Sequence, residues 1–340
     1  MSLGVFTSLV TPLLEAQRGG AQAFACDLAA ALERRGHRVV VYCAEGSHLP
    51  GRELVTVPVP ALRRALWRPG RPEPTPLPAL GEAFERLLAR VRQGGHDAVS
   101  GHAFDAEAIE QAQDLPVLHT LHLPPPAPRV LASAQQTGSH FAAVSAACAR
   151  QWRSAGLAEV ETIRNGSPDF VVTAVRPRPW ALIAGRVSPE KGTAAAIRVA
   201  RRSGLEVRLA GSVYDRAYWR REVRRRVSNL PRTTLWELMA RCSVCLMPVD
   251  WEEPYGLVAA EAQLAGCPVV GYRRGGLAEV VKDGSGGYLV APGDEDGLAE
   301  AVSRALQLDR VQIRNQARRR LLIGRCTAAY ERSLRRIAGL

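Results

Sequence analysis

Residues 250–280 read DWEEPYGLVAAEAQLAGCPVVGYRRGGLAEV, and this is the most informative stretch of the chain. Pro254 favours an extended or turned backbone just before it. Gly256 allows the chain to pass close to a ligand, because it has no side chain. The segment from Leu257 to Ala265 is rich in Ala, Leu and Glu and predicts a helix. The stretch therefore predicts a helix that begins directly behind a glycine-bearing loop.

Two carboxylates in this stretch are placed to flank one ligand. Glu253 lies on the loop before the helix, and Glu261 lies about two turns beyond it. The free N–H groups at a helix start suit a phosphate, whereas carboxylates accept hydrogen bonds from sugar hydroxyls. This arrangement fits a nucleotide sugar. The alternative is an ordinary helix–strand unit in which both glutamates are merely solvated.

The order of residues also resembles a known signature. The pattern E-P-Y-G-L-x-x-x-E, followed by A-x-x-x-G-x-P-V-V-x-x-x-x-G-G-x-x-E-V, resembles that of the retaining glycosyltransferases of family 4. The resemblance implies an α/β protein with the GT-B fold, in which two Rossmann-like doubly wound domains face each other across a cleft. It places a nucleotide-sugar donor against Tyr255, Gly256, Leu257 and Val258. It also assigns the ribose to Glu261 and the transferred sugar to Glu253, in the same stretch.

A second motif lies at residues 185–192, GRVSPEKG, after a predicted strand over 180–184 and before a predicted helix over 193–202. It resembles the G-R-x-x-x-x-K-G of the same family, in which the arginine and the lysine clamp the donor diphosphate. Gly185, Arg186 and Lys191 are the corresponding residues here. The chemistry agrees, since a leaving diphosphate needs cations held in place. The alternative is two exposed surface cations.

The first segment predicts a strand–loop–helix–strand unit, with an apolar run at residues 3–9, a helix over 22–35 and a strand over 38–43. Between the first strand and the helix stands Arg18-Gly19-Gly20-Ala21. This opening also resembles that of the family, whose two glycines contact the donor phosphate. Gly19 and Gly20 are therefore donor-site candidates, although a Gly-Gly pair alone is usually a turn.

A histidine stands at the end of a predicted strand, residues 116–122, PVLHTLH. Its Thr-x-His ending resembles the acceptor-side strand of the family, whose last histidine lies by the transferred sugar. By this match His122 is a candidate site residue, unless it is an ordinary loop histidine. His119 is expected on the opposite face of the sheet because side chains alternate along a strand.

The predicted organisation has four parts. Residues 1–169 form an acceptor-side domain, 170–179 a linker, 180–312 the nucleotide-sugar domain, and 313–340 a helix that returns to the first domain, as the resemblance implies. The chain departs from the family at residues 212–235. An arginine-rich helix is expected within residues 212–227, and after it a short segment, residues 228–232, stands in place of the strand that normally helps to build the base pocket in the family. The identity of the base therefore stays open.

Composition narrows the class of protein. The 340 residues are 46% hydrophobic and 23% charged, as expected for a globular protein of two domains. There is no long apolar run and no signal-peptide pattern, and the seven cysteines do not form a disulfide framework. Cys242-x-x-Cys245 lacks the second pair that a zinc site needs. We expect a cytoplasmic protein.

The net charge of +12 comes almost wholly from arginine, since Lys191 and Lys282 are the only lysines. Such a protein is drawn to nucleotide diphosphates, anionic membranes or nucleic acid. Trp67 lies among arginines in the proline-rich stretch 47–80. This segment is either a solvated loop or a peripheral contact with the inner face of a membrane.

The expected function is retaining transfer of a sugar from a nucleotide diphosphate sugar, such as UDP-glucose, to an unknown acceptor hydroxyl. The acceptor is a small molecule, a glycan or a lipid-linked compound. Glu253, His122, Arg186 and Lys191 are the candidate catalytic residues. No metal and no further cofactor are expected. The alternatives are a GT-B sugar-nucleotide epimerase, a nucleic-acid glucosyltransferase or nucleic-acid binder, and an inactive scaffold.

Overall fold

The computed structural model describes residues 1–14, 19–59, 78–173 and 175–340. It divides into two compact units, the first made of Met1–Asn165 together with Ile323–Leu340 and the second of Gly166–Leu322. The sequence placed the corresponding boundaries after residues 169 and 312. The basic segment around Trp67 lies outside the described residues, and so does Arg18 of the glycine motif.

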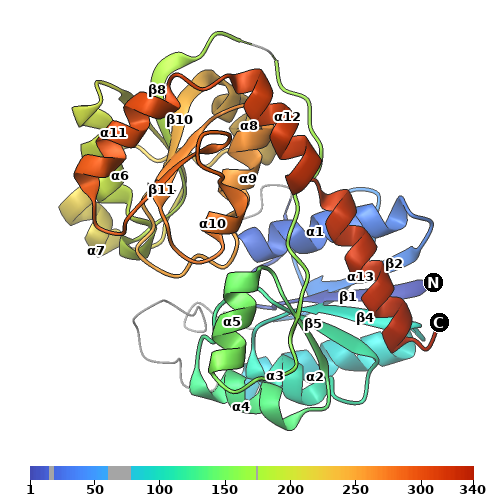
Figure 1. Ribbon diagram of the computed structural model, residues 1–340. Coiled ribbons are helices and arrows are strands. Elements are labelled where there is room, and N and C mark those ends of the chain that lie inside the picture. Colours follow the sequence, from blue (N-terminus) through green and yellow to red (C-terminus); the bar gives the residue numbers. More distant parts are fainter. Residues whose placement is uncertain (15–18, 60–77, 174) are drawn as a thin grey trace. The chain divides into compact units, whose positions relative to one another are not determined.

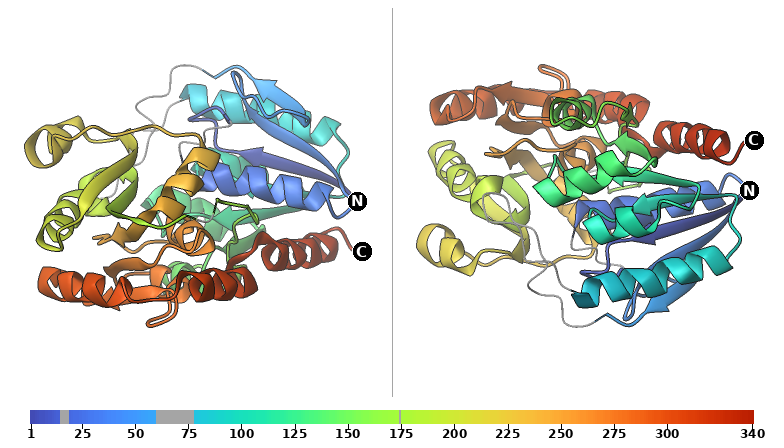
Figure 2. Two further views of the ribbon diagram at one scale, coloured as in Figure 1. Left: turned by 90° about the horizontal axis from the view of Figure 1, so that it is seen from above. Right: turned by 90° about the horizontal axis from the view of Figure 1, so that it is seen from below.

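The first unit is built on a parallel sheet of seven strands in the order β3-β2-β1-β4-β5-β6-β7 (Figures 1 and 2). The strands are β1 Ser2–Thr7, β2 Arg38–Ala44, β3 Glu53–Val57, β4 Ala98–His102, β5 Val117–Leu121, β6 His140–Ala143 and β7 Glu161–Thr162. Runs of buried apolar residues such as VVVYC in β2 form these strands, since a sheet covered on both faces needs apolar residues at consecutive positions. The polar residues that end β4 and β5 therefore gather at one edge of the sheet.

Helices cover both faces of this sheet. They are α1 Gly20–Glu33, α2 Pro78–Gln93, α3 Ala106–Gln111, α4 Pro128–Gln136, α5 Ala146–Ser154 and α13 Ile323–Ile337. Figure 1 shows α1 and α13 on one face and α2 and α3 on the other. Phe84 of α2 belongs to a core cluster with Phe6 and Tyr42, whereas Phe24 of α1 packs against Tyr330 of α13 on the opposite face. The two faces thus have separate apolar cores.

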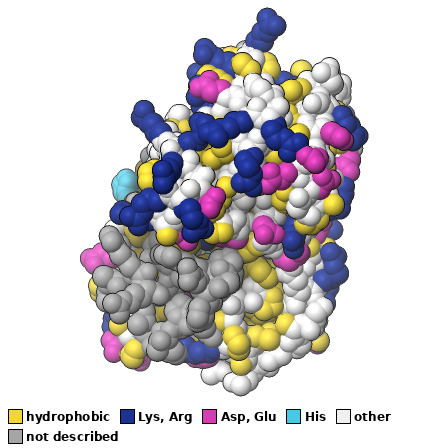
Figure 3. Space-filling model, turned by 90° about the vertical axis from the view of Figure 1, so that its left-hand side faces the viewer, with side chains coloured by type: hydrophobic (Ala, Val, Ile, Leu, Met, Phe, Trp, Pro, Cys, Tyr) yellow, Lys and Arg dark blue, Asp and Glu magenta, His cyan; other side chains and the backbone are white. Residues whose placement is uncertain are grey.

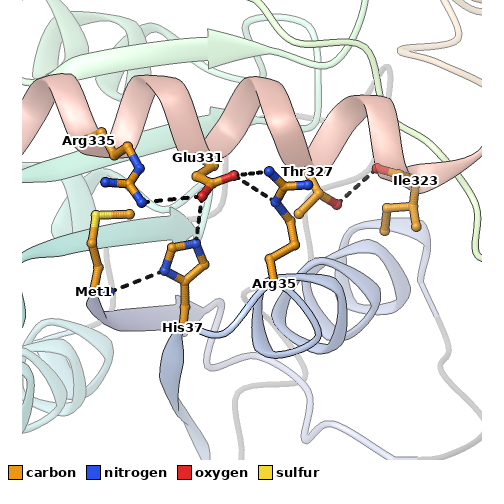
Figure 4. Close-up of polar contacts among 7 residues, drawn as sticks. All are labelled: Met1, Arg35, His37, Ile323, Thr327, Glu331 and Arg335. Atoms are coloured by element: carbon orange, nitrogen blue, oxygen red, sulfur yellow. Dashed lines mark hydrogen bonds and ion pairs between the residues drawn. The ribbon is translucent and has the colours of Figure 1, made fainter.

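The last helix, α13, is fixed to the first unit by polar contacts as well as by packing (Figure 4). Glu331 accepts a hydrogen bond from Nε of Arg35 at 2.6 Å and contacts Nε2 of His37 at 3.0 Å. The amino group of Met1 lies 3.3 Å from Nδ1 of the same histidine. Buried Tyr330 also bonds Thr120 of β5 at 3.0 Å. The chain end is therefore an integral part of the first unit.

The second unit has a parallel sheet of five strands in the order β12-β11-β10-β8-β9. Its elements are β8 Arg178–Val187, the 3₁₀ turn η1 Pro189–Lys191, α6 Thr193–Arg202, β9 Glu206–Val213, α7 Arg216–Tyr218, the π-helical turn η2 Trp219–Val223, α8 Arg232–Arg241, β10 Cys242–Met247, α9 Leu257–Leu264, β11 Val269–Tyr272, α10 Leu277–Val280, β12 Gly287–Val290, α11 Glu295–Ala305 and α12 Arg310–Leu321. α6 and α11 pack together on one face, and α8 and α9 contact the strands from the other (Figure 1). This is the doubly wound arrangement that the sequence predicts.

The arginine-rich segment differs from its prediction. In place of a regular helix, the chain forms only α7 and the π turn η2, which ends at Arg224 in a left-handed conformation with φ of 44°. Tyr218 and Val223 are buried in the core, and their spacing fits a widened turn. Arg216, Arg220 and Arg221 are exposed, as expected of a solvated surface. Figure 3 views this side of the protein, where Lys and Arg side chains gather.

Each helix in the described part of the chain is too short or too polar to span a lipid bilayer.

Candidate functional site

The loop that carries the G-R-x-x-x-x-K-G motif is held by two glycines. Gly185 has φ of 127° and Gly192 has φ of 64°, which are conformations that residues with a side chain rarely adopt. A Cβ atom on Gly192 would also collide with the carbonyl oxygen of Pro248. The backbone N–H of Asp250 donates to the carbonyl of Glu190 at 2.8 Å. The two motifs of the sequence therefore lie against each other at the edge of the second sheet.

Lys191 and Glu253 form the centre of this site. Nζ of Lys191 lies 2.6 Å from Oε2 of Glu253, and the indole N–H of Trp251 donates to the same oxygen at 2.7 Å. The lysine ammonium also lies 4.7 Å from the centre of the Trp251 ring. The side chains of the pair are only 20% and 11% exposed. A cation and a carboxylate are thus held together with little water around them.

The R-G-G part of the signature, residues 274–276, fixes the backbone of Glu253. The N–H of Gly276 donates to the carbonyl of Glu253 at 2.6 Å. A Cβ on Gly275 would collide with backbone atoms of Glu253, so the close approach requires glycine. These glycines therefore position a site residue, a role that the sequence alone does not reveal.

Helix α9 begins beside the Glu253 side chain. Its N-cap is Gly256, with φ of 97°, and a Cβ there would lie 3.9 Å from Cγ of Glu253. The first hydrogen bond of the helix runs from Ala260 N to Gly256 O at 3.1 Å. The N–H groups of Leu257 and Val258 precede that bond and point out of the helix start. An anion placed there would meet both these donors and the helix dipole.

Arg186 is oriented by its own loop. Its guanidinium lies 4.9 Å from the centre of the Tyr214 ring and 3.6 Å from Oε1 of Glu190. Ser188 donates to the same glutamate oxygen at 2.7 Å. The aromatic ring and the carboxylate restrict a long side chain that would otherwise be mobile. Arg186 and Lys191 thus belong to one short loop, as the motif predicts.

Glu261 is paired with an arginine that the sequence did not single out. Nε and Nη2 of Arg232 both donate to Oε1 of Glu261, at 2.9 and 2.6 Å. The two side chains are 17% and 6% exposed. The guanidinium lies 5.1 Å from the centre of the Trp236 ring. Both of these hydrogen bonds go to a single carboxylate oxygen, Oε1.

His122 belongs to the first unit and lies at the carboxyl edge of its sheet, just after β5. Nε2 of His122 lies 2.9 Å from Nδ1 of His102, and Nε2 of His102 lies 3.0 Å from Oγ of Ser100. Burial lowers the pKa of His122 to about 3 and lowers the pKa of His102 well below its usual range. Both rings are therefore neutral near pH 7.

The predicted division of the two β5 histidines between the faces of the sheet is confirmed. His122 packs against Phe24 of α1, with ring centres 5.7 Å apart. His119 stacks on Phe141 and meets Phe6 on the other face. Both ring nitrogens of His119 are buried without a hydrogen-bond partner in the described structure.

The same edge of the sheet carries the glycine motif and a half-buried acid. Gly19 is the N-cap of α1 and Gly20 is its first residue, so this helix begins two residues earlier than predicted. The hydroxyl of Ser8, which follows β1, donates to Asp105 after β4 at 2.9 Å. Burial raises the pKa of Asp105 to about 6.

The described residues contain no cluster of three or more His, Cys, Asp or Glu side chains that could hold a metal ion. Cys242 and Cys245 lie in the buried strand β10, and burial raises the pKa of both thiols well above its usual range. Such thiols stay protonated at neutral pH and are poor metal ligands and nucleophiles.

The structure brings together Lys191 and Glu253, places Arg186 on the same loop, and gives Glu261 a separate partner. Sequence reasoning did not identify Trp251, Arg232 or His102 as site residues. Trp251 lies two positions before Glu253 on the loop that precedes α9, and this proximity in the sequence is a signal that could have found it. No spacing links Arg232 to Glu261, because the contact joins separate helices.

Two family models match the chain in succession. The model described as Glycosyltransferase Family 4 matches residues 18–168, and the model described as Glycosyl transferases group 1 matches residues 170–320. Glycogen synthase of Mycobacterium tuberculosis is 31% identical in an alignment of 284 positions that covers 67% of this chain and 66% of that protein. The chain therefore spans just under two thirds of this relative. D-inositol 3-phosphate glycosyltransferase of Acidothermus cellulolyticus is 26% identical over 85% of this chain and 78% of its own length.

Solved structures share the fold over the whole chain. Sucrose-phosphate synthase from Thermosynechococcus elongatus aligns with a TM-score of 0.77 and 19% identity, covering 100% of both chains. HepE from Anabaena, solved with UDP and glucose, aligns with a TM-score of 0.75 and 18% identity over 98% of this chain and 99% of its own. Together with the two family models, these likenesses show that the chain belongs to glycosyltransferase family 4 and has the GT-B fold.

Proposed function

We propose that this protein is a retaining, metal-independent glycosyltransferase that moves a hexose from UDP-hexose, with UDP-glucose as the first candidate, to an acceptor hydroxyl. The observation that carries the proposal is the contact of Lys191 with Glu253 beside the N-terminus of α9. It joins a phosphate-binding cation and a sugar-binding carboxylate next to free backbone N–H groups. The UDP and glucose bound to the related HepE structure support the choice of donor.

In this proposal the second unit stabilises the leaving group. Breaking the bond between the sugar and the diphosphate leaves negative charge on the phosphate oxygens. Lys191, Arg186 and the N–H groups of Leu257 and Val258 offset that charge, and fixed donors contribute most when they are oriented before the reaction. Paired cations and a helix start can do this without a metal ion.

The two glutamates would bind the ends of the donor. Glu253 accepts hydrogen bonds from hydroxyls of the hexose while Lys191 holds its other side. Glu261 receives the ribose hydroxyls at Oε2, because Oε1 is already bonded to Arg232. Each carboxylate therefore has one oxygen tied to a cation and one directed to a hydroxyl, which fixes its orientation before the donor binds.

Retention fits attack on the same face that the diphosphate leaves, with a phosphate oxygen taking the proton of the acceptor hydroxyl. The proposal uses no protein carboxylate as a nucleophile, since Glu253 is engaged by both Lys191 and Trp251. His122 is assigned to the sugar or acceptor by the family resemblance. A polyol or glucan hydroxyl is the acceptor class that the names of the two curated relatives favour.

The test measures UDP release from UDP-glucose in the presence of candidate acceptors, with product anomers assigned by NMR. Lys191→Ala and Glu253→Ala should lose transfer by at least about 100-fold, the usual loss when an oriented transition-state contact is removed. Lys282→Ala, which changes the other lysine at an exposed position, is the matched control and should keep full activity. Full activity in either site variant, at unchanged circular dichroism, would refute the assignment.

The same assay separates the alternatives. An epimerase would turn over UDP-glucose with no acceptor present. A nucleic-acid glucosyltransferase would need duplex DNA or RNA, and its binding would fall steeply with salt. An inactive scaffold would bind UDP without any turnover.

A further inference from the structure

The first unit contains a continuous chain of three polar side chains that ends at His122. Ser100 and His102 come from β4, and His122 follows β5, the neighbouring strand. The contacts are 3.0 Å between Ser100 Oγ and His102 Nε2 and 2.9 Å between His102 Nδ1 and His122 Nε2. Each ring nitrogen of His102 is therefore engaged.

This chain is enclosed on nearly all sides. Ser100 is 1% exposed, His102 is 2% and His122 is 7%. The ring of Phe24 lies 5.9 Å from that of His102, and the ring of Tyr330 lies 6.3 Å from it. In the described structure, Nδ1 of His122 has no hydrogen-bond partner and is not among the fully covered polar atoms. This nitrogen is therefore the accessible end of the Ser100–His102–His122 series, and it lies at the carboxyl edge of the sheet.

The protonation site of one histidine ring depends on that of the other. Both are neutral, so each carries one N–H, and the contact between them needs one donor and one acceptor. If Nδ1 of His102 carries the proton, then His122 must carry its own proton at Nδ1. If Nδ1 of His102 is the acceptor, His122 must carry its proton at Nε2. The tautomer of His122, and hence what its open nitrogen offers to a hydroxyl, depends on His102.

We propose that His102 is a positioning residue that holds His122 in one ring orientation and one neutral tautomer, with Nδ1 of His122 presented to a substrate hydroxyl. A ring nitrogen that is fixed either as a donor or as an acceptor binds a hydroxyl in the complementary role. A freely rotating histidine would lose conformational freedom when it adopted that state on binding. This proposal rests on the proposed function in one respect, because the hydroxyl that His122 contacts is one of the sugar or acceptor in that reaction.

The decisive variants are His102→Phe and His102→Asn. Phenylalanine keeps a ring between Phe24 and Tyr330 and removes both hydrogen bonds. Asparagine keeps a polar atom at the δ position, where Nδ1 of His102 contacts His122. His119→Phe is the matched control, because His119 is equally buried and lies on β5 but has no hydrogen-bond partner in the described structure.

The first readout is the tautomer of His122 from the side-chain nitrogen shifts of ¹⁵N-histidine-labelled protein, with the signal assigned by its absence in His122→Phe. We expect one tautomer in the wild type, in His119→Phe and in His102→Asn, and a mixture of two in His102→Phe. A mixture in the wild type, or an unchanged single tautomer in His102→Phe, would overturn the proposal. This readout needs no substrate, so it stands or fails apart from the transferase activity.

The second readout is the rate with UDP-glucose and acceptor. His102→Phe should lose about 10- to 100-fold in kcat/KM, the range typical of partners that orient metal-bound histidines. His102→Asn should recover most of this loss and His119→Phe should show none. Equal losses in His102→Asn and His102→Phe, at matched melting temperatures, would mean that the role of His102 is only structural and would contradict the proposal.

Discussion

The contact between Lys191 and Glu253 predicts that substitutions at these two residues have opposite effects on the binding of UDP. Nζ of Lys191 lies 2.6 Å from Oε2 of Glu253. A diphosphate that binds Lys191 must therefore share this cation with a carboxylate of its own sign. Glu253→Gln keeps the shape of the side chain and removes the competing charge. It should strengthen the binding of UDP, which has no hexose for Glu253 to hold.

The size of the effect follows from the contact. A hydrogen bond between charged groups contributes about 1.5–3 kcal/mol. The pair keeps some exposure to water, 20% for the lysine, so the lower part of this range applies. The lower end, about 1.5 kcal/mol, corresponds to a roughly tenfold tighter Kd for UDP. The additional affinity that the hexose gives UDP-glucose over UDP should fall by a similar factor in the same variant.

Isothermal titration with UDP and with UDP-glucose measures both effects. Lys191→Met should weaken both ligands by about 10- to 100-fold, since it removes the cation and leaves a buried carboxylate beside the phosphates. Lys282→Met should change neither Kd. If Glu253→Gln weakens UDP as strongly as Lys191→Met does, the carboxylate supports the phosphate site, and the division of roles proposed for the pair is refuted.

Three further predictions concern the free energy of unfolding, measured by chemical denaturation. Arg232→Leu should lower it by about 3 kcal/mol, because Glu261 is left as a buried charge without its partner, and adding Glu261→Leu should restore most of the loss. The folded-state pKa of Asp105 is about 6, above its ordinary value of 3.8, so the native state binds this proton more tightly and loses stability as the pH rises from 4 to 6. Asp105→Asn should therefore stabilise the protein at pH 7.5 by about 1–2 kcal/mol, less than the full shift implies because the residue is partly exposed, and should do nothing at pH 4. Gly192→Ala should lower the free energy of unfolding by over about 3 kcal/mol, since it combines a left-handed backbone with a collision against Pro248. Gly204→Ala, at a residue with a similar φ and open space around it, should lower it by about 1 kcal/mol. Equal losses in the two variants would contradict the packing argument.

Local pattern predicted much of the fold. The helix expected over residues 193–202 is α6, Thr193–Arg202, and the one expected from Leu257 ends at Leu264, one residue early. Both follow from helix formers that begin behind a glycine with positive φ. The faces of His119 and His122 follow from strand alternation. Such features depend on neighbours in the sequence, which a single chain displays directly.

The parts that were missed depend on contacts between distant segments. Arg232 and Glu261 meet because α8 and α9 pack beside each other, and nothing in the spacing of the two residues reports this. The sequence analysis predicts an arginine-rich helix within residues 212–227. The chain forms a π turn there, because Tyr218 and Val223 both reach the core and the turn must widen to place them. Burial thus overrides propensity where the two disagree.

The first unit is assembled from both ends of the chain, and this has a consequence for how the protein is made. Its sheet is synthesised first, but the surface under α13, including Thr120 and Phe24, stays uncovered until Tyr330 leaves the ribosome. By then every strand of the second unit has already emerged. The later half of the protein can therefore fold before the earlier half is finished, and a nascent chain that stops at Leu322 would leave the apolar surface normally covered by α13 exposed to chaperones and proteases.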